Sequence, residues 1–271
     1  MSDSDAWTGR GEDGGGTEVD AFLDRWEKSG GSESANFQMF AGELCELLGV
    51  AKPDPSEELN EYNDYTFERR VDFKHDDGST SLKRIDLYRR GSFVMEAKQS
   101  AKRRAKTTAD SRQTDMLPED AMQVKAGAAT RGTRGWDRTM RAAKRQAEDY
   151  ARALPPEHGW PPFILVVDVG HVFEVYADFS GQGKNYAQFP DREGYSIPLS
   201  GLRDPEVRAL LRAVWTDPLS LDPARRSAEV TRDIAARLAR IARSLEDRGR
   251  HPEEVAEFLM RCLFTMFAED V

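Results

Sequence analysis

The fold of this chain is decided by the stretch Arg84-Ile-Asp-Leu-Tyr-Arg-Arg-Gly-Ser-Phe-Val-Met-Glu-Ala-Lys98. Two short apolar runs meet at Gly91, a pattern typical of a β-hairpin. Because side chains alternate between the two faces of a strand, Glu96 and Lys98 point to the same face. Pairing about Gly91 places Asp86 across from Glu96. The stretch therefore predicts two facing carboxylates beside an ammonium group, which suits metal-assisted hydrolysis of a phosphodiester.

A hairpin with an ordinary exposed ion pair is the alternative interpretation of this pattern. The neighbours of the three polar residues favour a site instead, since they are apolar: Ile85, Leu87, Phe93, Val94 and Met95. Polar groups in such strands usually need a partner or a metal ion. Gln99, directly after the strand, either contacts a bound substrate or faces solvent.

The distribution of charge matters more than the net charge of −9. Residues 1–64 carry 16 acids and 4 bases, whereas residues 81–106 carry 9 bases and only 2 acids, Asp86 and Glu96. Residues 125–145 add 7 bases and 1 acid. Basic charge thus gathers around the two carboxylates, as a site for a polyanion such as nucleic acid requires.

Several classes of protein are excluded by composition. The chain has no apolar run long enough to span a membrane and no secretory leader, so we expect no membrane partner and a cytoplasmic location. Two distant cysteines and four scattered histidines argue against a disulfide framework and against a zinc site.

The organisation along the chain predicts three parts. Residues 1–17 are rich in Gly, Asp and Ser and read as a disordered tail. Residues 18–200 alternate helical and strand patterns, which predicts an α/β domain with a mixed central sheet flanked by helices. Residues 201–271 contain only helical patterns and form a small all-α module. The last pattern runs to the final residue, so we expect this chain to be part of a longer polypeptide.

The strands and helices expected within these parts follow from the apolar periodicity. Strands are expected at 65–74, 82–88, 92–97, 163–169 and 171–178, and helices at 19–29, 34–48, 136–153, 205–216, 223–247 and 252–270. Residues 75–79 read as a turn, and residues 100–133 read as a long loop with a helical piece at 120–128.

The helix expected at 136–153 carries Gln146 and Tyr150 on one face, four residues apart. They either border the predicted site or pack on the sheet. Basic residues of the same helix favour phosphate contact, although a solvated face explains them equally well: Arg138, Arg141, Lys144 and Arg145.

The order helix–strand–strand–strand–helix–strand, with Asp86 and Glu96-x-Lys98 in strands two and three, resembles the PD-(D/E)xK nuclease core over residues 34–178. The resemblance implies Mg²⁺, with Mn²⁺ as an alternative, bound by Asp86, Glu96 and the Ala97 carbonyl. It makes Lys98 the residue that orients water and offsets negative charge. It also implies substrate contacts or support from Gln99, Gln146 and Tyr150. In some relatives an acid of the first core helix reaches the metal site, which makes Glu43 an additional candidate, with an ordinary surface residue as the alternative.

A closer resemblance, to the MmeI-like type IIL restriction–modification enzymes, rests on several stretches: Phe22-Leu-Asp-Arg-Trp26, Asn36-Phe-Gln38, Tyr65-Thr-Phe-Glu-Arg69, Arg84-Ile-Asp-Leu-Tyr88 and Phe93-Val-Met-Glu-Ala-Lys-Gln99. It implies a nuclease domain at 18–200 and a helical spacer at 201–271. The partners implied are double-stranded DNA, a C-terminal adenine-N6 methyltransferase with a target-recognition domain, and an oligomer for double-strand cleavage. S-adenosylmethionine belongs to the missing methyltransferase, because the chain has no Asn-Pro-Pro-Tyr tetrapeptide.

Two functions are compatible with these observations. The first is a Mg²⁺-dependent DNA endonuclease domain used in phage defence. The second is a catalytically weak or inactive module with the nuclease fold, which binds DNA or a partner subunit for a defence-system methyltransferase.

Overall fold

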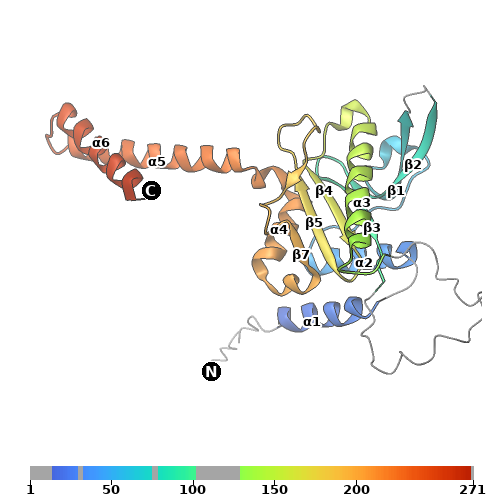
Figure 1. Ribbon diagram of the computed structural model, residues 1–271. Coiled ribbons are helices and arrows are strands. Elements are labelled where there is room, and N and C mark those ends of the chain that lie inside the picture. The colour runs from blue at the N-terminus through green and yellow to red at the C-terminus, as the bar shows by residue number, and fades with distance from the viewer. Residues whose placement is uncertain (1–13, 30–32, 75–78, 102–128, 270–271) are drawn as a thin grey trace, which may run out of the picture. The chain divides into compact units, whose positions relative to one another are not determined.

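This computed structural model describes residues 14–29, 33–74, 79–101 and 129–269 (Figure 1). Its helices are α1 (Gly14–Glu27), α2 (Glu33–Leu48), α3 (Arg134–Ala153), α4 (Pro205–Thr216), α5 (Pro223–Glu246) and α6 (Pro252–Glu269). Its strands are β1 (Tyr65–Lys74), β2 (Thr80–Arg89), β3 (Phe93–Lys98), β4 (Phe163–Asp168), β5 (Val172–Ala177), β6 (Ala187–Gln188) and β7 (Ser196–Pro198). Short 3₁₀ helices lie at Asn60–Tyr62, Pro156–His158, Leu199–Arg203 and Pro218–Leu221.

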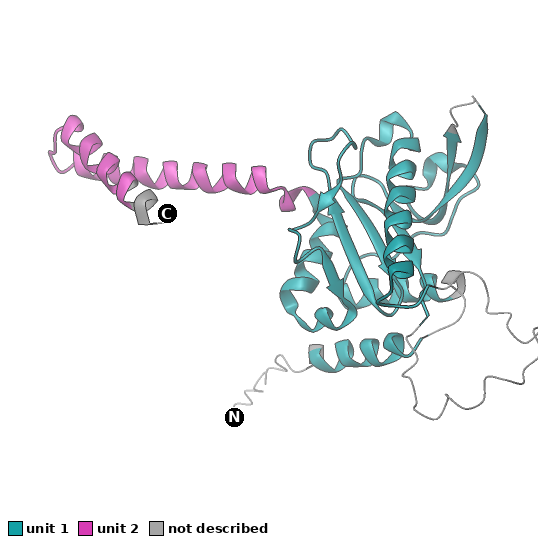
Figure 2. Cartoon of the chain, viewed as in Figure 1, with its two compact units in different colours: residues 1–218 teal, residues 219–271 magenta. Residues whose placement is uncertain are grey.

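The chain divides into two compact units, residues 1–218 and 219–271 (Figure 2). The first contains the sheet with α1 to α4, and the second consists mainly of α5 and α6. Within the described parts of the chain, no helix is long and apolar enough to cross a membrane.

One mixed sheet organises the first unit. Its strand order is β1-β2-β3-β4-β5-β6, with β7 also paired to β5. Only β3 and β4 run parallel among the strand pairs of the described residues, and all the others are antiparallel. A parallel pair needs a crossover connection, and α3 supplies the helix of that connection. The expected α/β fold with a mixed, helix-flanked sheet is confirmed.

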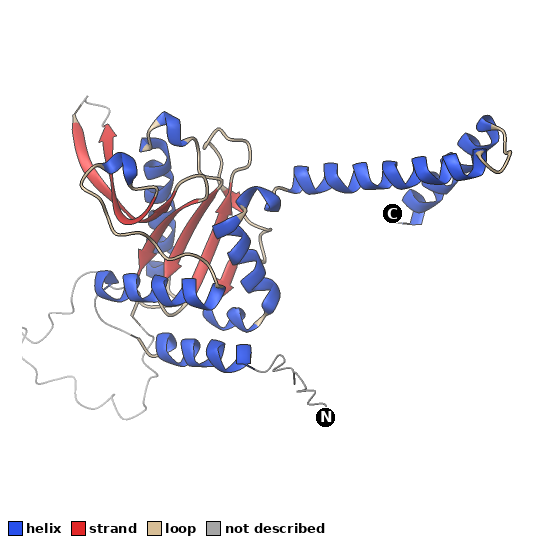
Figure 3. Ribbon diagram, turned by 180° about the vertical axis from the view of Figure 1, so that it is seen from behind, coloured by secondary structure: helices blue, strands red, loops and turns tan. Residues whose placement is uncertain are grey.

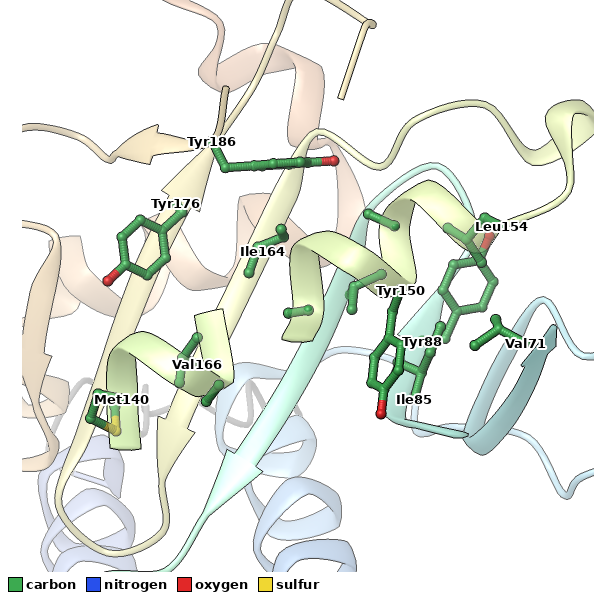
Figure 4. Packing of buried hydrophobic residues seen from close by; sticks show 14 of the residues in the cluster. Val71, Ile85, Tyr88, Met140, Tyr150, Leu154, Ile164, Val166, Tyr176 and Tyr186 are labelled. Carbon is green, nitrogen blue, oxygen red and sulfur yellow. The ribbon is translucent and has the colours of Figure 1, made fainter. Parts of the chain in front are cut away.

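The two faces of the sheet are covered by different helices (Figures 1 and 3). On one face, Met140 and Tyr150 of α3 pack with Ile85, Ile164 and Val166 of the sheet, as Figure 4 shows. The buried side of α3 reads Met140, Ala143, Ala147, Tyr150 and Ala151, a helical repeat in which alanines allow close approach to the strands.

The opposite face packs on α2 and α4 through aromatic rings. Phe40 of α2 stacks on Phe173 of β5 with ring centroids 5.8 Å apart. The ring centroids of Trp215 of α4 and Phe93 of β3 lie 4.5 Å apart. The Trp215 indole nitrogen donates a hydrogen bond of 2.9 Å to the Tyr65 hydroxyl. Since α4 is anchored in this way, it belongs to the first unit, whereas composition predicts a boundary at residue 200.

Most expected elements agree with the structure to within a few residues. The short strands β6 and β7 were not expected, because two or three residues carry no periodicity. α1 starts at Gly14, inside the expected tail. The rest of that tail to residue 13, the turn at 75–78 and the helical piece at 120–128 lie outside the described residues.

The turn between β4 and β5 depends on Gly170. Its φ is +73°, and a Cβ built there would lie 2.2 Å from the Trp26 carbonyl oxygen. Gly91, in the turn between β2 and β3, has a similar φ of +67° but no atom within 4 Å of its Cβ position. A side chain at Gly91 would therefore meet backbone strain alone, whereas a side chain at Gly170 would meet strain and a steric clash.

We predict that Gly170→Ala lowers the free energy of unfolding by more than about 2 kcal/mol, since strain and clash add. Gly91→Ala should cost about 1 kcal/mol, from the left-handed conformation alone. Chemical denaturation of both variants measures the difference. Equal losses would contradict the close contact between Gly170 and Trp26.

Candidate active site

The predicted hairpin is present, and it opens at Asp86. Gly91 makes the turn, and the ladder between β2 and β3 runs from Arg89↔Phe93 to Leu87↔Met95. Beyond that pair, the Asp86 carboxylate fills the gap and accepts a hydrogen bond of 2.7 Å from the backbone N–H of Ala97. The side chain of Asp86 is therefore held near the C-terminal end of β3.

A distortion in β1 lies beside this opening. Glu68 has φ +54°, a left-handed conformation that is strained for a residue with a side chain. The ladder between β1 and β2 skips the position of Glu68 and Asp86, between Phe67↔Leu87 and Arg69↔Ile85. Local strain of this kind is found at functional sites.

Glu96 and Lys98 share the face of β3 that α3 covers, as expected. The Lys98 ammonium group donates to Glu96 Oε1 at 2.7 Å. The Glu96 side chain is 2% exposed and that of Lys98 is 22% exposed. The pair is therefore not the exposed surface ion pair of the alternative interpretation, because its carboxylate is removed from water.

Gln146 and Tyr150 of α3 lie against the same site. The Gln146 amide donates to the Tyr150 hydroxyl at 2.7 Å. Burial is the main cause that raises the pKa of Tyr150, and the negative charges of Glu96 and Asp86 raise it further. The phenol thus stays protonated at neutral pH, in the electrostatic field of both carboxylates.

Gln99 and Glu43 are placed differently from one another. Gln99 follows Lys98 and accepts a hydrogen bond of 3.0 Å from the Asn36 amide of α2. Glu43, also in α2, accepts from the Trp26 indole at 2.7 Å and pairs with Arg25 at 3.1 Å. These contacts of Glu43 tie α2 to α1, and among the described residues none of them joins Glu43 to Asp86 or Glu96.

The donor set of the hairpin suits a hard cation. Two carboxylates and a backbone carbonyl offer only oxygen ligands, and Mg²⁺ commonly takes few protein oxygens and keeps several waters. Among the described residues, no group of three or more His, Cys, Asp or Glu side chains could hold a metal ion.

The structure adds a residue that sequence reasoning missed, Asp168 at the end of β4. Its buried carboxylate accepts from the backbone N–H and hydroxyl of Ser100 and, at 2.8 Å, from the Trp136 indole. Arg131 approaches it to 3.7 Å and also donates to the Val169 carbonyl at 3.0 Å. This cluster joins the ends of β3 and β4 to the start of α3.

Only the strand end Val-Val-Asp168 signalled this residue, since a carboxylate that ends a buried strand must find partners. The register places Lys98 directly beside Asp168 in the parallel pair. The Asp168 cluster therefore fixes the backbone that carries the predicted site.

We predict that Asp168→Ala lowers the free energy of unfolding by about 3 kcal/mol or more, because Arg131 and the Trp136 indole lose a buried acceptor. Denaturant titration measures the loss. Asp191→Ala is the control, since the hydrogen bonds that this carboxylate accepts from described residues come from two backbone N–H groups of an exposed turn. An equal loss in both variants would contradict a special role for Asp168.

Comparison with known proteins identifies the family of the chain. No curated protein and no solved structure matches the chain. A protein-family model described as MmeI, N-terminal domain matches residues 17–248, which is most of the chain. The chain therefore belongs to the MmeI N-terminal domain family.

Proposed function

We propose that this chain is the Mg²⁺-dependent DNA endonuclease domain of a restriction–modification polypeptide that acts in the cytoplasm. The observation that carries the proposal is the ion pair between the buried Glu96 and the half-buried Lys98 next to Asp86, on a strand held between α2 and α3. Family membership supports a role in restriction and modification. The parent polypeptide is expected to carry an adenine-N6 methyltransferase that uses S-adenosylmethionine and a domain that reads the target sequence.

The residues of the hairpin and of α3 have different roles in this proposal. Asp86, Glu96 and the Ala97 carbonyl bind the cation, for which Mn²⁺ is the alternative to Mg²⁺. When bound, the ion stabilises charge on the phosphate and makes water a better nucleophile. Lys98 orients the attacking water and offsets the negative charge that develops at phosphorus. Gln99, Gln146 and Tyr150 line the approach and contact the DNA backbone or support Lys98.

The hydrogen bonds of Glu96 and Asp86 are compatible with the binding of a cation, for which Glu96 would exchange Lys98. Lys98 holds Glu96 through one carboxylate oxygen, Oε1, and Asp86 meets Ala97 through Oδ2. A cation next to Glu96 would compete with the ammonium group for the carboxylate. Lys98 would then be directed toward a bound phosphate.

We predict that Asp86→Asn and Lys98→Gln each reduce plasmid cleavage by about 100-fold or more in the full-length polypeptide with Mg²⁺. The matched control is Lys144→Gln, which also removes a lysine paired with a carboxylate, Glu148 at 3.1 Å. The control should cleave like the wild type.

Equal cleavage by all four proteins would contradict the site assignment. A wild type that binds DNA but never cuts it would favour the alternative function, a nuclease-fold module that holds DNA or a partner subunit for the methyltransferase. Gel electrophoresis of supercoiled plasmid distinguishes the two results, because nicked and linear products separate from the substrate.

A further inference from the structure

Four arginines form a stripe along the solvent side of α3. Arg134, Arg138, Arg141 and Arg145 are all exposed, and their spacing puts them within a narrow sector of the helix, opposite its buried side. The stripe runs for about 16 Å. We call it the α3 stripe.

Other cations of α3 and its surroundings are already engaged. Lys144 pairs with Glu148 at 3.1 Å and lies 4.8 Å from the centre of the Tyr176 ring. Arg152 pairs with Asp149 at 2.7 Å, and Arg131 belongs to the Asp168 cluster. By contrast, no ion pair among the described residues involves a member of the α3 stripe.

This arrangement costs the helix stability. Arg134 occupies the first turn of α3, where the partial positive charge of the helix N-terminus disfavours a cation. Neighbours along the stripe are three or four residues apart, so their like charges repel one another. Acidic residues are abundant in this chain, whose net charge is −9, and carboxylates placed beside the stripe would relieve this repulsion. A polyanion that contacts all four arginines would offset the cost.

We propose that the α3 stripe binds the phosphate backbone of double-stranded DNA, along a helix whose other side covers the predicted active site. The inference rests on the proposed function for its choice of DNA. Arginines spaced along about 16 Å can meet several phosphates of one strand. Gln146, on the flank of α3 between the stripe and the sheet, connects this surface to Tyr150 at the site.

The test measures binding without cleavage. A fluorescein-labelled DNA duplex of about 30 base pairs is titrated with the chain in EDTA, and KCl is varied between about 50 and 200 mM. The stripe variant replaces all four arginines of the α3 stripe with glutamine. The control variant makes the same change in charge on α5, at four exposed arginines: Arg226→Gln, Arg232→Gln, Arg240→Gln and Arg243→Gln.

The stripe variant should bind at least about tenfold more weakly than the wild type. The negative slope of log affinity against log salt should become shallower by about 3. The α5 control should stay within about twofold of the wild type, because it tests net charge alone. Thermal unfolding checks that both variants fold. If the stripe variant does not fold, the double variant Arg138→Gln/Arg145→Gln should show about half the change in slope.

Three results would overturn the proposal: a stripe variant that binds like the wild type, an α5 control that loses as much affinity, or a chain that binds single-stranded RNA but not the duplex. The titration is carried out in EDTA, where the proposed metal-dependent cleavage cannot occur. A failure of the proposed nuclease therefore leaves the binding result unaffected.

Discussion

The parallel pairing of β3 with β4 is the constraint on which the rest of the structure depends. A chain cannot return to run parallel to its neighbour through a tight turn, so a helical crossover is required. Here the crossover includes α3, and α3 lies on the face of β3 that presents Glu96 and Lys98. The same topology therefore builds the sheet, removes the Glu96 carboxylate from bulk water and brings Gln146 and Tyr150 to the site.

Burial gives the polar hairpin its chemical character. The charge of Glu96 is balanced by Lys98 at 2.7 Å, and Asp86 is held by the Ala97 N–H. In a site of low dielectric, such contacts are stronger than at the surface, and a bound cation would change their balance. The Asp168 cluster at the end of β4 holds the neighbouring backbone in place, so the site is supported from the strand beside it.

The features that depend on local periodicity could be predicted from the sequence. The turn at Gly91, the shared face of Glu96 and Lys98 and the spacing of Gln146 and Tyr150 follow from the period of two in strands and 3.6 in helices. The pairing of Gln99 with Asn36, the link from Glu43 to Trp26 and the Asp168 cluster join residues distant in sequence. Periodicity cannot reveal such contacts, since each depends on how the helices pack on the finished sheet.

Calorimetric titration of Mg²⁺ or Mn²⁺ into the chain tests the central claim most directly, because it needs neither a target sequence nor a methyltransferase. We expect saturable binding to the wild type that is lost in Asp86→Asn and in Glu96→Gln, and kept in Glu193→Gln, which changes an exposed carboxylate outside the site. Binding that is absent from the wild type, or unchanged in the Asp86 and Glu96 variants, would contradict the assignment of this hairpin as a metal site.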